Sequence, residues 1–210
     1  MVISALSILF ALPQLKSVVR FPQPFRAFSS LKMNTNSIVV VGSANVDLTA
    51  YSENLPSKGE TTLGTNFKTS LGGKGANQAI AAARLSGNSK IHMICKVGKD
   101  SYGKQLMKNF DQSGVRYSNN DVLSNDSHTG IATITVDSTG ENTIVVVPGS
   151  NHDLTSDDVS NQLEGIINNN GIDGSYGSII MTQLEIKHDA ALTAMKIGRA
   201  ANIRSKPFVR

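Results

Sequence analysis

Short apolar runs alternate with amphipathic segments from residue 37 onward. The runs SIVVVGS (37–43), IHMICKVG (91–98) and GSIIMTQLE (177–185) have the composition of buried strands. Apolar residues recur at helical spacing in four further segments: residues 76–86, the stretch between Asp100 and Gly114, the stretch that Thr155 opens, and residues 188–200. Strands that alternate with helices in this way predict an α/β fold, with a parallel sheet flanked by helices.

Two segments have a different pattern. Residues 48–71 are rich in Thr, alternate loosely and are broken by Pro56 and Gly59. Residues 129–149 contain two alternating runs around Gly140. Alternation with one polar face is typical of antiparallel strands, so 48–71, and with it 129–149, predict a small antiparallel sheet beside the main one.

The stretch LGGKGANQAIAAARLSG (71–87) places three glycines directly before a helix. It is not a P-loop, because Lys74 is followed by Gly75 and not by Ser or Thr. It is not a dinucleotide motif either, because Gln78 stands where the last glycine would be required. A flexible backbone beside free helix amides suits a hydroxyl-rich ligand, and the alternative is a tight turn packed for its own sake.

Polar side chains follow two of the predicted strands. Asn45 and Asp47 are two positions apart, so in extended backbone they face the same side and can grip neighbouring hydroxyls. Glu185 comes directly after the apolar run SIIMTQL (178–184), at the edge where ligands gather in open α/β sheets. Taken singly, the first pair could be an Asx turn and Glu185 a solvated loop carboxylate.

The net charge of +4 comes from the N-terminal leader. Residues 1–37 contain Lys16, Arg20, Arg26 and Lys32 and no acidic residue, whereas the rest of the chain is balanced. The basic pI therefore does not argue for a nucleic-acid partner. A Ser-rich, basic, acid-free leader predicts an organelle transit peptide, for a plastid ahead of a mitochondrion. A start at Met33 would give a cytosolic form, and a secretory signal is disfavoured because no basic residues precede the apolar stretch.

Cysteine and histidine offer little chemistry. The single cysteine, Cys95, lies in an apolar run and is expected to be a buried thiol. The four histidines have no partner at the spacing of metal ligands, so we predict no metal site built on them. The leader's apolar run is too short to span a bilayer, and we predict no membrane partner.

Together the motifs resemble the ribokinase branch of the carbohydrate and purine kinase (PfkB) family. The matching stretches are VVVGSANVDL, LPSKGET, LGGKGANQAIAAARLSG, VGKDSYGKQL, STGENTIVVVPGSN and MTQLE, in the family's order from about residue 38 to about 200. The resemblance implies an ATP-dependent kinase that converts D-ribose to ribose 5-phosphate. It also implies that the small sheet is a lid over the sugar, through which two subunits pair as a homodimer. The sugar-binding residues that it implies are Asn45, Val46, Asp47, Gly73, Lys74, Gly75, Ala76, Asn77 and Glu185.

The same resemblance implies ATP, Mg²⁺ and K⁺ as cofactors. The family's D-T-x-G-A-G-D motif, which provides an anion-binding helix terminus and the catalytic base, does not occur in the 210 residues, and neither does its N-x-x-E motif. We therefore expect no catalytic or cofactor-binding residue in this chain, and the C-terminal part of the fold to be missing. The tail RAANIRSKPFVR is expected to diverge at 201–210 without adding the next strand.

Three interpretations remain open from sequence. The chain is an incomplete form of a ribokinase that is inactive alone; or a non-catalytic product that binds sugar or pairs with a full-length kinase; or part of a sister kinase for fructose or adenosine.

Overall fold

A computed structural model describes residues 36–87, 89–170, 172 and 177–208. The predicted transit peptide (1–37) lies outside the described residues except for its last two positions. None of the helices in the described part combines the length and apolar character needed to cross a membrane.

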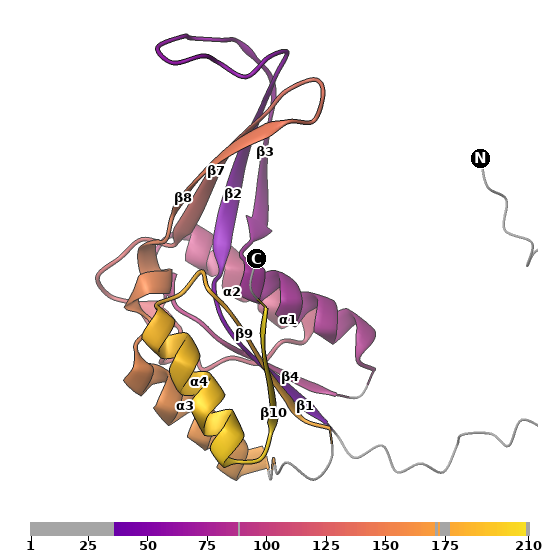
Figure 1. The fold of residues 1–210 in the computed structure, drawn as a ribbon, viewed down its shortest axis with the longest axis vertical. Helices are drawn as coiled ribbons and strands as arrows, with labels where there is room; N and C mark the ends of the chain where they lie inside the picture. Colours follow the sequence, from indigo (N-terminus) through magenta and orange to yellow (C-terminus); the bar gives the residue numbers. More distant parts are fainter. Residues whose placement is uncertain (1–35, 88, 171, 173–176, 209–210) are drawn as a thin grey trace, which may run out of the picture. The chain divides into compact units, whose positions relative to one another are not determined.

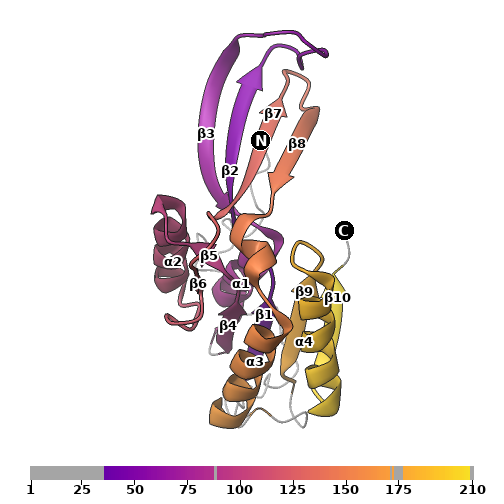
Figure 2. The ribbon, with the colours of Figure 1, turned by 90° about the vertical axis from the view of Figure 1, so that its left-hand side faces the viewer.

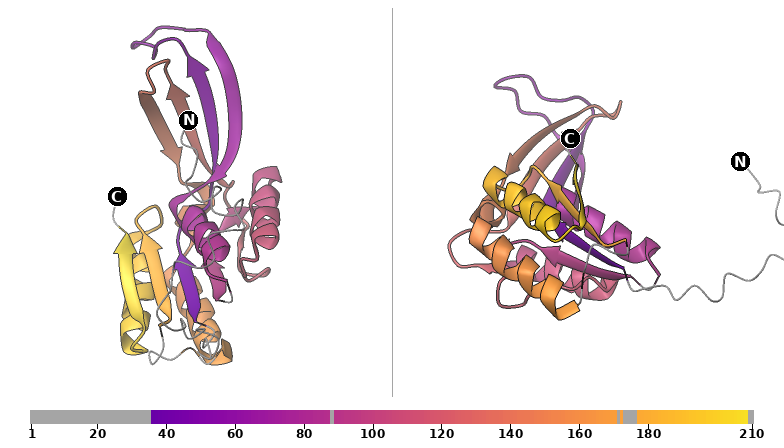
Figure 3. Two further views of the ribbon diagram at one scale, coloured as in Figure 1. Left: turned by 90° about the vertical axis from the view of Figure 1, so that its right-hand side faces the viewer. Right: turned by 60° about the horizontal axis from the view of Figure 1, so that its bottom comes forward.

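The main sheet has four strands, all parallel. Its spatial order is β10-β9-β1-β4, with β1 at Ser37–Val41, β4 at Lys90–Ile94, β9 at Ile179–Gln183 and β10 at Arg204–Phe208. Helices cover both faces, as Figure 1 and the right-hand view of Figure 3 show. The predicted α/β architecture is confirmed.

The sheet is buried on both sides because successive residues of each strand face opposite helices. On one side, Val40 and Met93 pack with helices α1 (Lys74–Leu85) and α2 (Ser101–Ser113). On the other side, Val39 and Ile180 pack in a second cluster with helices α3 (Ser156–Asn170) and α4 (His188–Ala200). This two-sided burial is the reason why β1, β4 and β9 lie in apolar runs, whereas β10, with the sequence RSKPF at the edge of the sheet, does not.

The helix boundaries follow local signals. Asp100 caps α2, since its carboxylate accepts a hydrogen bond from the Gly103 amide at 2.8 Å. Gly114 ends α2 with φ 71°, a left-handed conformation that favours glycine.

The predicted helix at 76–86 begins two residues earlier, at Lys74, because its cap comes from elsewhere in the fold. The run at 91–98 is divided between β4 and the two-residue strand β5 (Val97–Gly98), which pairs with β6 (Leu123–Ser124).

The second sheet, which we call the lid sheet, consists of β2 (Asn45–Ser52), β3 (Gly64–Gly72), β7 (Gly130–Val136) and β8 (Asn142–Val147). Its order is β3-β2-β7-β8, and it projects away from the helices in Figure 2. One expectation was wrong: the sheet is mixed and not purely antiparallel, because its central strands β2 and β7 pair in parallel. These two strands are not joined by a hairpin, so nothing forces them to run in opposite directions.

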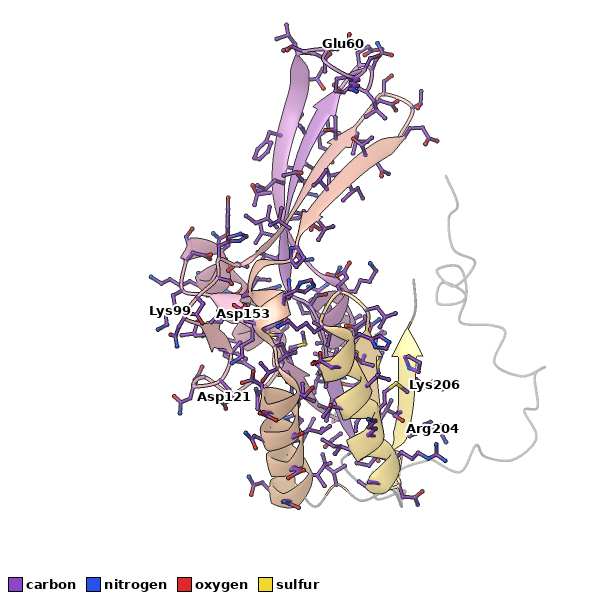
Figure 4. The ribbon with its side chains drawn as sticks, turned by 60° about the vertical axis from the view of Figure 1, so that its left-hand side comes forward. Glu60, Lys99, Asp121, Asp153, Arg204 and Lys206 are labelled. Carbon is purple, nitrogen blue, oxygen red and sulfur yellow. The ribbon has the colours of Figure 1, made fainter. Side chains whose placement is uncertain are left out.

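The C-terminal segment also differs from expectation. Residues 204–208 form β10, which pairs in parallel with β9 from Arg204 opposite Ile179 to Phe208 opposite Gln183. Figure 4 shows Arg204 and Lys206 on this strand. The expectation that the tail adds no strand was wrong, because α4 returns the chain to the sheet beside β9.

Candidate functional site

The candidate site lies at the carboxyl ends of the parallel strands. β1 leads through Gly42 into the first lid strand, β3 leads from the lid sheet through Gly73 into α1, and Glu185 follows the end of β9. The crossings at Gly42 and Gly73 thus lie at the edge where α/β proteins bind ligands. Three segments that are far apart in the sequence meet there.

A cavity of about 240 Å³ opens at this junction. Its polar lining is formed by Asn45, Asp47, Gly73, Lys74, Asn77 and Glu185, and its apolar lining by Ala132, Ile134, Ile144 and Val146. Because a water molecule takes up about 30 Å³ in the liquid, a cavity of this volume can hold several water molecules or a small polar ligand. Two larger hollows, of about 630 and 430 Å³, lie away from these residues.

Glu185 connects the three segments. Its carboxylate accepts a hydrogen bond from the Ser43 hydroxyl at 2.7 Å and from the Lys74 backbone amide at 3.1 Å. The Lys74 Nζ forms an ion pair with the other carboxylate oxygen at 2.5 Å. The Lys74 amide belongs to the first turn of α1, where no side chain of the preceding residues provides a cap. A carboxylate from a distant loop therefore caps this helix, where the helix dipole favours negative charge.

The two carboxylates of the pocket titrate in opposite directions. Burial and the nearby charge of Glu185 raise the pKa of Asp47 above its ordinary value. Burial also opposes ionisation of Glu185, but hydrogen bonds from Lys74 and Ser43 outweigh it and lower the pKa of Glu185. Glu185 is therefore the firmly ionised partner of Lys74, and Asp47 is the carboxylate whose charge is less favoured.

Glycine is required where the chain segments cross. A Cβ on Gly72 would lie 2.3 Å from an Asp47 carboxylate oxygen, and Gly73 has φ 92° with Asn45 N 2.7 Å from the Cβ position. A side chain at either position would displace the pocket residues of β2. The glycine-rich stretch thus lets β3 and the start of α1 approach β2 closely.

Six of the nine predicted site residues line the cavity, and three do not. Val46 is fully buried in the core, because alternation along β2 turns it away from Asn45 and Asp47. Gly75 and Ala76 are buried where α1 packs on β1, and the Gly75 amide lies 3.4 Å from the Ser43 hydroxyl. These three residues support the site from the core and do not line the cavity, and their contact with a sugar stays a prediction.

The apolar wall of the cavity was not predicted. Ala132 and Ile134 on β7 and Ile144 and Val146 on β8 face the same side of the lid sheet as Asp47. Alternation in residues 129–149 could have identified these faces. Only the pairing of β2 with β7 brings them to the pocket, and no local signal encodes that pairing.

Within the described residues, no group of three or more His, Cys, Asp or Glu side chains could hold a metal ion. Cys95 is buried, and burial raises its pKa to about 12, which makes it an unreactive thiol. The polar groups that line the cavity suit a hydroxylated ligand.

Comparison with known families identifies the fold. The model of the pfkB family carbohydrate kinases matches residues 35–209. The chain belongs to this family. This pfkB-family chain is also similar to ribokinases: it is 38% identical to that of Dictyostelium discoideum over 167 residues (80% of this chain and 49% of that protein). It is 46% identical to the ribokinase of Bacillus subtilis (strain 168) over 132 residues (62% and 43%). The chain thus spans about half the length of these relatives.

Solved structures agree with the family assignment. The structure of Arabidopsis thaliana ribokinase complexed with ribose and ATP superposes with a TM-score of 0.64 at 30% identity, over 83% of this chain and 53% of that one. Ribokinase from Giardia lamblia superposes with a TM-score of 0.70 at 27% identity, over 82% and 51%.

Proposed function

We propose that this chain forms the sugar-binding part of a ribokinase-type kinase, which transfers phosphate from ATP to D-ribose and yields ribose 5-phosphate. The observation that supports this most directly is the convergence of Asn45, Asp47, the Lys74 turn and Glu185 on one cavity. Relatives at 35–46% identity that are ribokinases support the choice of sugar.

The chemistry of the cavity fits a polyol. Asp47 and Glu185 accept hydrogen bonds from hydroxyl groups, while Lys74 and the Asn77 amide can donate them. In the described structure Lys74 and Glu185 bind each other, so a sugar hydroxyl would share an existing charged pair. The apolar wall of the lid sheet would cover the sugar and exclude water, which competes with a hydroxyl for the transferred phosphoryl group.

We propose that the 210-residue chain binds sugar and does not phosphorylate it unaided. Phosphoryl transfer depends on positioning and charge stabilisation, and the D-T-x-G-A-G-D sequence that provides the base and anion site in the family does not occur here. ATP-dependent ribose phosphorylation by the purified chain, abolished by Asp47→Ala, would overturn this.

The test of the proposed ligand is a calorimetric titration of the purified chain with D-ribose, 2-deoxy-D-ribose, D-fructose and adenosine. The deoxy sugar belongs in the panel because the deoxyribokinase of Salmonella typhi is 34% identical to this chain. We expect D-ribose to bind most tightly and Asp47→Asn to weaken it about 10- to 100-fold, since hydrogen bonds to a charged group are worth about 1.5–3 kcal/mol. The control is Glu164→Gln, on the exposed side of α3. Preference for fructose or adenosine would refute the choice of sugar.

We further propose that two copies pair through the lid sheet. Four successive residues of its edge strand β8 are apolar and exposed: Ile144, Val145, Val146 and Val147. An exposed apolar edge strand is a site for pairing with another chain. The partner is then a second copy of this chain.

For the leader we propose import into a plastid. A fusion of residues 1–37 to a fluorescent protein, expressed in leaf cells, should locate to plastids. Mitochondrial or cytosolic fluorescence would contradict this.

A further inference from the structure

Asn151 lies outside the cavity but next to one of its polar residues. It belongs to the short 3-10 helix η1 (Gly149–Asp153), which follows the lid strand β8, and it is 1% exposed. Its side chain packs against Ala44 and Asn45, at the start of β2 and more than 100 residues away in the sequence. A fully buried amide at this place must satisfy its donors and acceptor locally.

The orientation of the Asn151 amide is fixed by backbone groups. Its Oδ1 accepts a hydrogen bond from the Ala44 amide at 2.8 Å. Its Nδ2 donates to the Pro148 carbonyl at 2.9 Å and lies 3.4 Å from the Ala44 carbonyl. A backbone N–H can only donate and a carbonyl can only accept, so reversing the side-chain amide would oppose all three contacts.

This orientation determines that of Asn45. The Asn151 Nδ2 also donates to the Asn45 Oδ1 at 2.6 Å. Asn45 must therefore turn its oxygen toward Asn151, which leaves its NH₂ group on the other side. Asn45 lines the cavity, and among the residues that the structure describes its side chain makes no other hydrogen bond.

The fold leaves space for this contact. Gly130 on β7 pairs with Asn45 in the lid sheet. A Cβ on Gly130 would lie 2.2 Å from the Asn151 Nδ2 and 2.3 Å from the Asn45 Oδ1. Only glycine at this position permits the two amides to meet.

We propose that Asn151 is a positioning residue that makes Asn45 a hydrogen-bond donor toward the sugar. This rests on the proposed function, because it assigns a direction to one contact of the same cavity. Asp47, on the same face of β2, accepts hydrogen bonds. The pair therefore selects hydroxyl groups, which donate to Asp47 and accept from Asn45, over positions that lack a hydroxyl.

A first experiment tests the amide orientation without any ligand. In ¹⁵N,¹³C-labelled chain, a through-hydrogen-bond scalar coupling is expected between the Asn151 side-chain nitrogen and the Asn45 side-chain carbonyl carbon. The backbone couplings of the parallel sheet provide the internal reference. Absence of the side-chain coupling in spectra that show the backbone ones would overturn the proposal, whether or not any sugar binds.

A second experiment tests the consequence for binding. In Asn151→Asp, one oxygen can still accept from Ala44, but the other cannot donate to Asn45, so the Asn45 amide reverses and presents its oxygen to the cavity. We expect the dissociation constant for D-ribose to rise at least 10-fold. The Asn45 NH₂ resonances, which should shift on addition of ribose to the unchanged chain, should no longer do so.

A double-mutant cycle separates this role from a general loss of structure. Asn45→Ala removes the proposed donor, so adding Asn151→Asp to it should weaken binding less than two-fold further. Ser150→Ala is the matched control. Ser150 lies in η1 beside Asn151, and its buried hydroxyl donates to the Lys96 carbonyl and does not contact Asn45. It should lower the urea midpoint and leave the dissociation constant within two-fold. Additive effects of Asn45→Ala and Asn151→Asp, or an equal loss of affinity in Ser150→Ala, would overturn the proposal.

Discussion

A single carboxylate, Glu185, joins three segments of the pocket through its hydrogen bonds to Ser43 and Lys74. Because these bonds lower its pKa, Glu185 contributes stability that is present above its ordinary value of 4.5 and is lost as the pH falls through the lower folded-state value. Acidification below pH 4.5 should therefore loosen the pocket. A second group, His92, also affects the stability of the fold as it titrates, but in a higher pH range.

His92 on β4 is 7% exposed, and its Nε2 has no hydrogen-bond partner among the described residues. Burial, with the nearby charges of Arg116 and Lys90, lowers the pKa of His92 to about 4. Between the ordinary value of 6.5 and this value, the unfolded chain binds a proton that the folded chain does not, so stability falls as the pH falls.

We predict that urea unfolding of the unchanged chain loses about 1.5 kcal/mol between pH 6.5 and pH 5 through this residue alone. In His92→Gln this contribution should vanish. The measurement is the difference in unfolding free energy between the two proteins at each pH. A difference that stays constant from pH 7 to pH 5 would contradict the prediction.

At the scale of elements, the helices and strands follow patterns that are local in the sequence. The span of α4 equals the prediction, and α2 has the predicted cap and the predicted terminating glycine. The start of α1 was misplaced, because Ser43 and Glu185 cap it from 32 and 111 residues away. Such a cap leaves no signature in the residues next to the helix, and the sequence rules for helix caps consider only those residues.

The contact between α1 and β1 depends on a helical glycine. A Cβ on Gly75 would lie 2.7 Å from the backbone of Gly42 and Ser43, neither of which can move without displacing the strand. We predict that Gly75→Ala costs about 3 kcal/mol or more of unfolding free energy, since overpacking against backbone cannot relax.

The matched control is Gly165→Ala in α3, where a Cβ would meet nothing within 4 Å. Alanine is the better helix former, so this variant should be stabilised by about 0.5–1 kcal/mol. Urea denaturation of both variants checks the pair. If the two variants were equally stable, the close packing of α1 on β1 would not be what makes glycine necessary at position 75.

At the scale of the whole described chain, the lid sheet is the part with the least cover. In Figure 4 its side chains project on both sides, with Glu60 at the far tip between β2 and β3. The exposed β8 residues face alternately toward the cavity and away from it. A partner on either face would bury apolar surface that the isolated chain leaves in water.

We predict that the combined substitutions Ile144→Asp and Val145→Asp, one on each face of β8, raise the dimer dissociation constant at least 10-fold. Two charges would then have to be buried on pairing. Analytical ultracentrifugation measures the effect. The control is Leu85→Asp, which changes a residue 86% exposed at the end of α1. An unchanged sedimentation profile in the β8 variant would exclude the lid sheet as the interface.

The sequence by itself determined the α/β class, the approximate position of nearly every helix and strand, and six residues that line the cavity. It could do so because periodicity, caps and glycines act over a few residues. Only the tertiary structure decided the parallel pairing of β2 with β7, the apolar wall, the strand at 204–208 and the contact of Asn151 with Asn45. These depend on which distant segments pack together, and that is set by the burial of both sheet faces at once and not by any single stretch of chain.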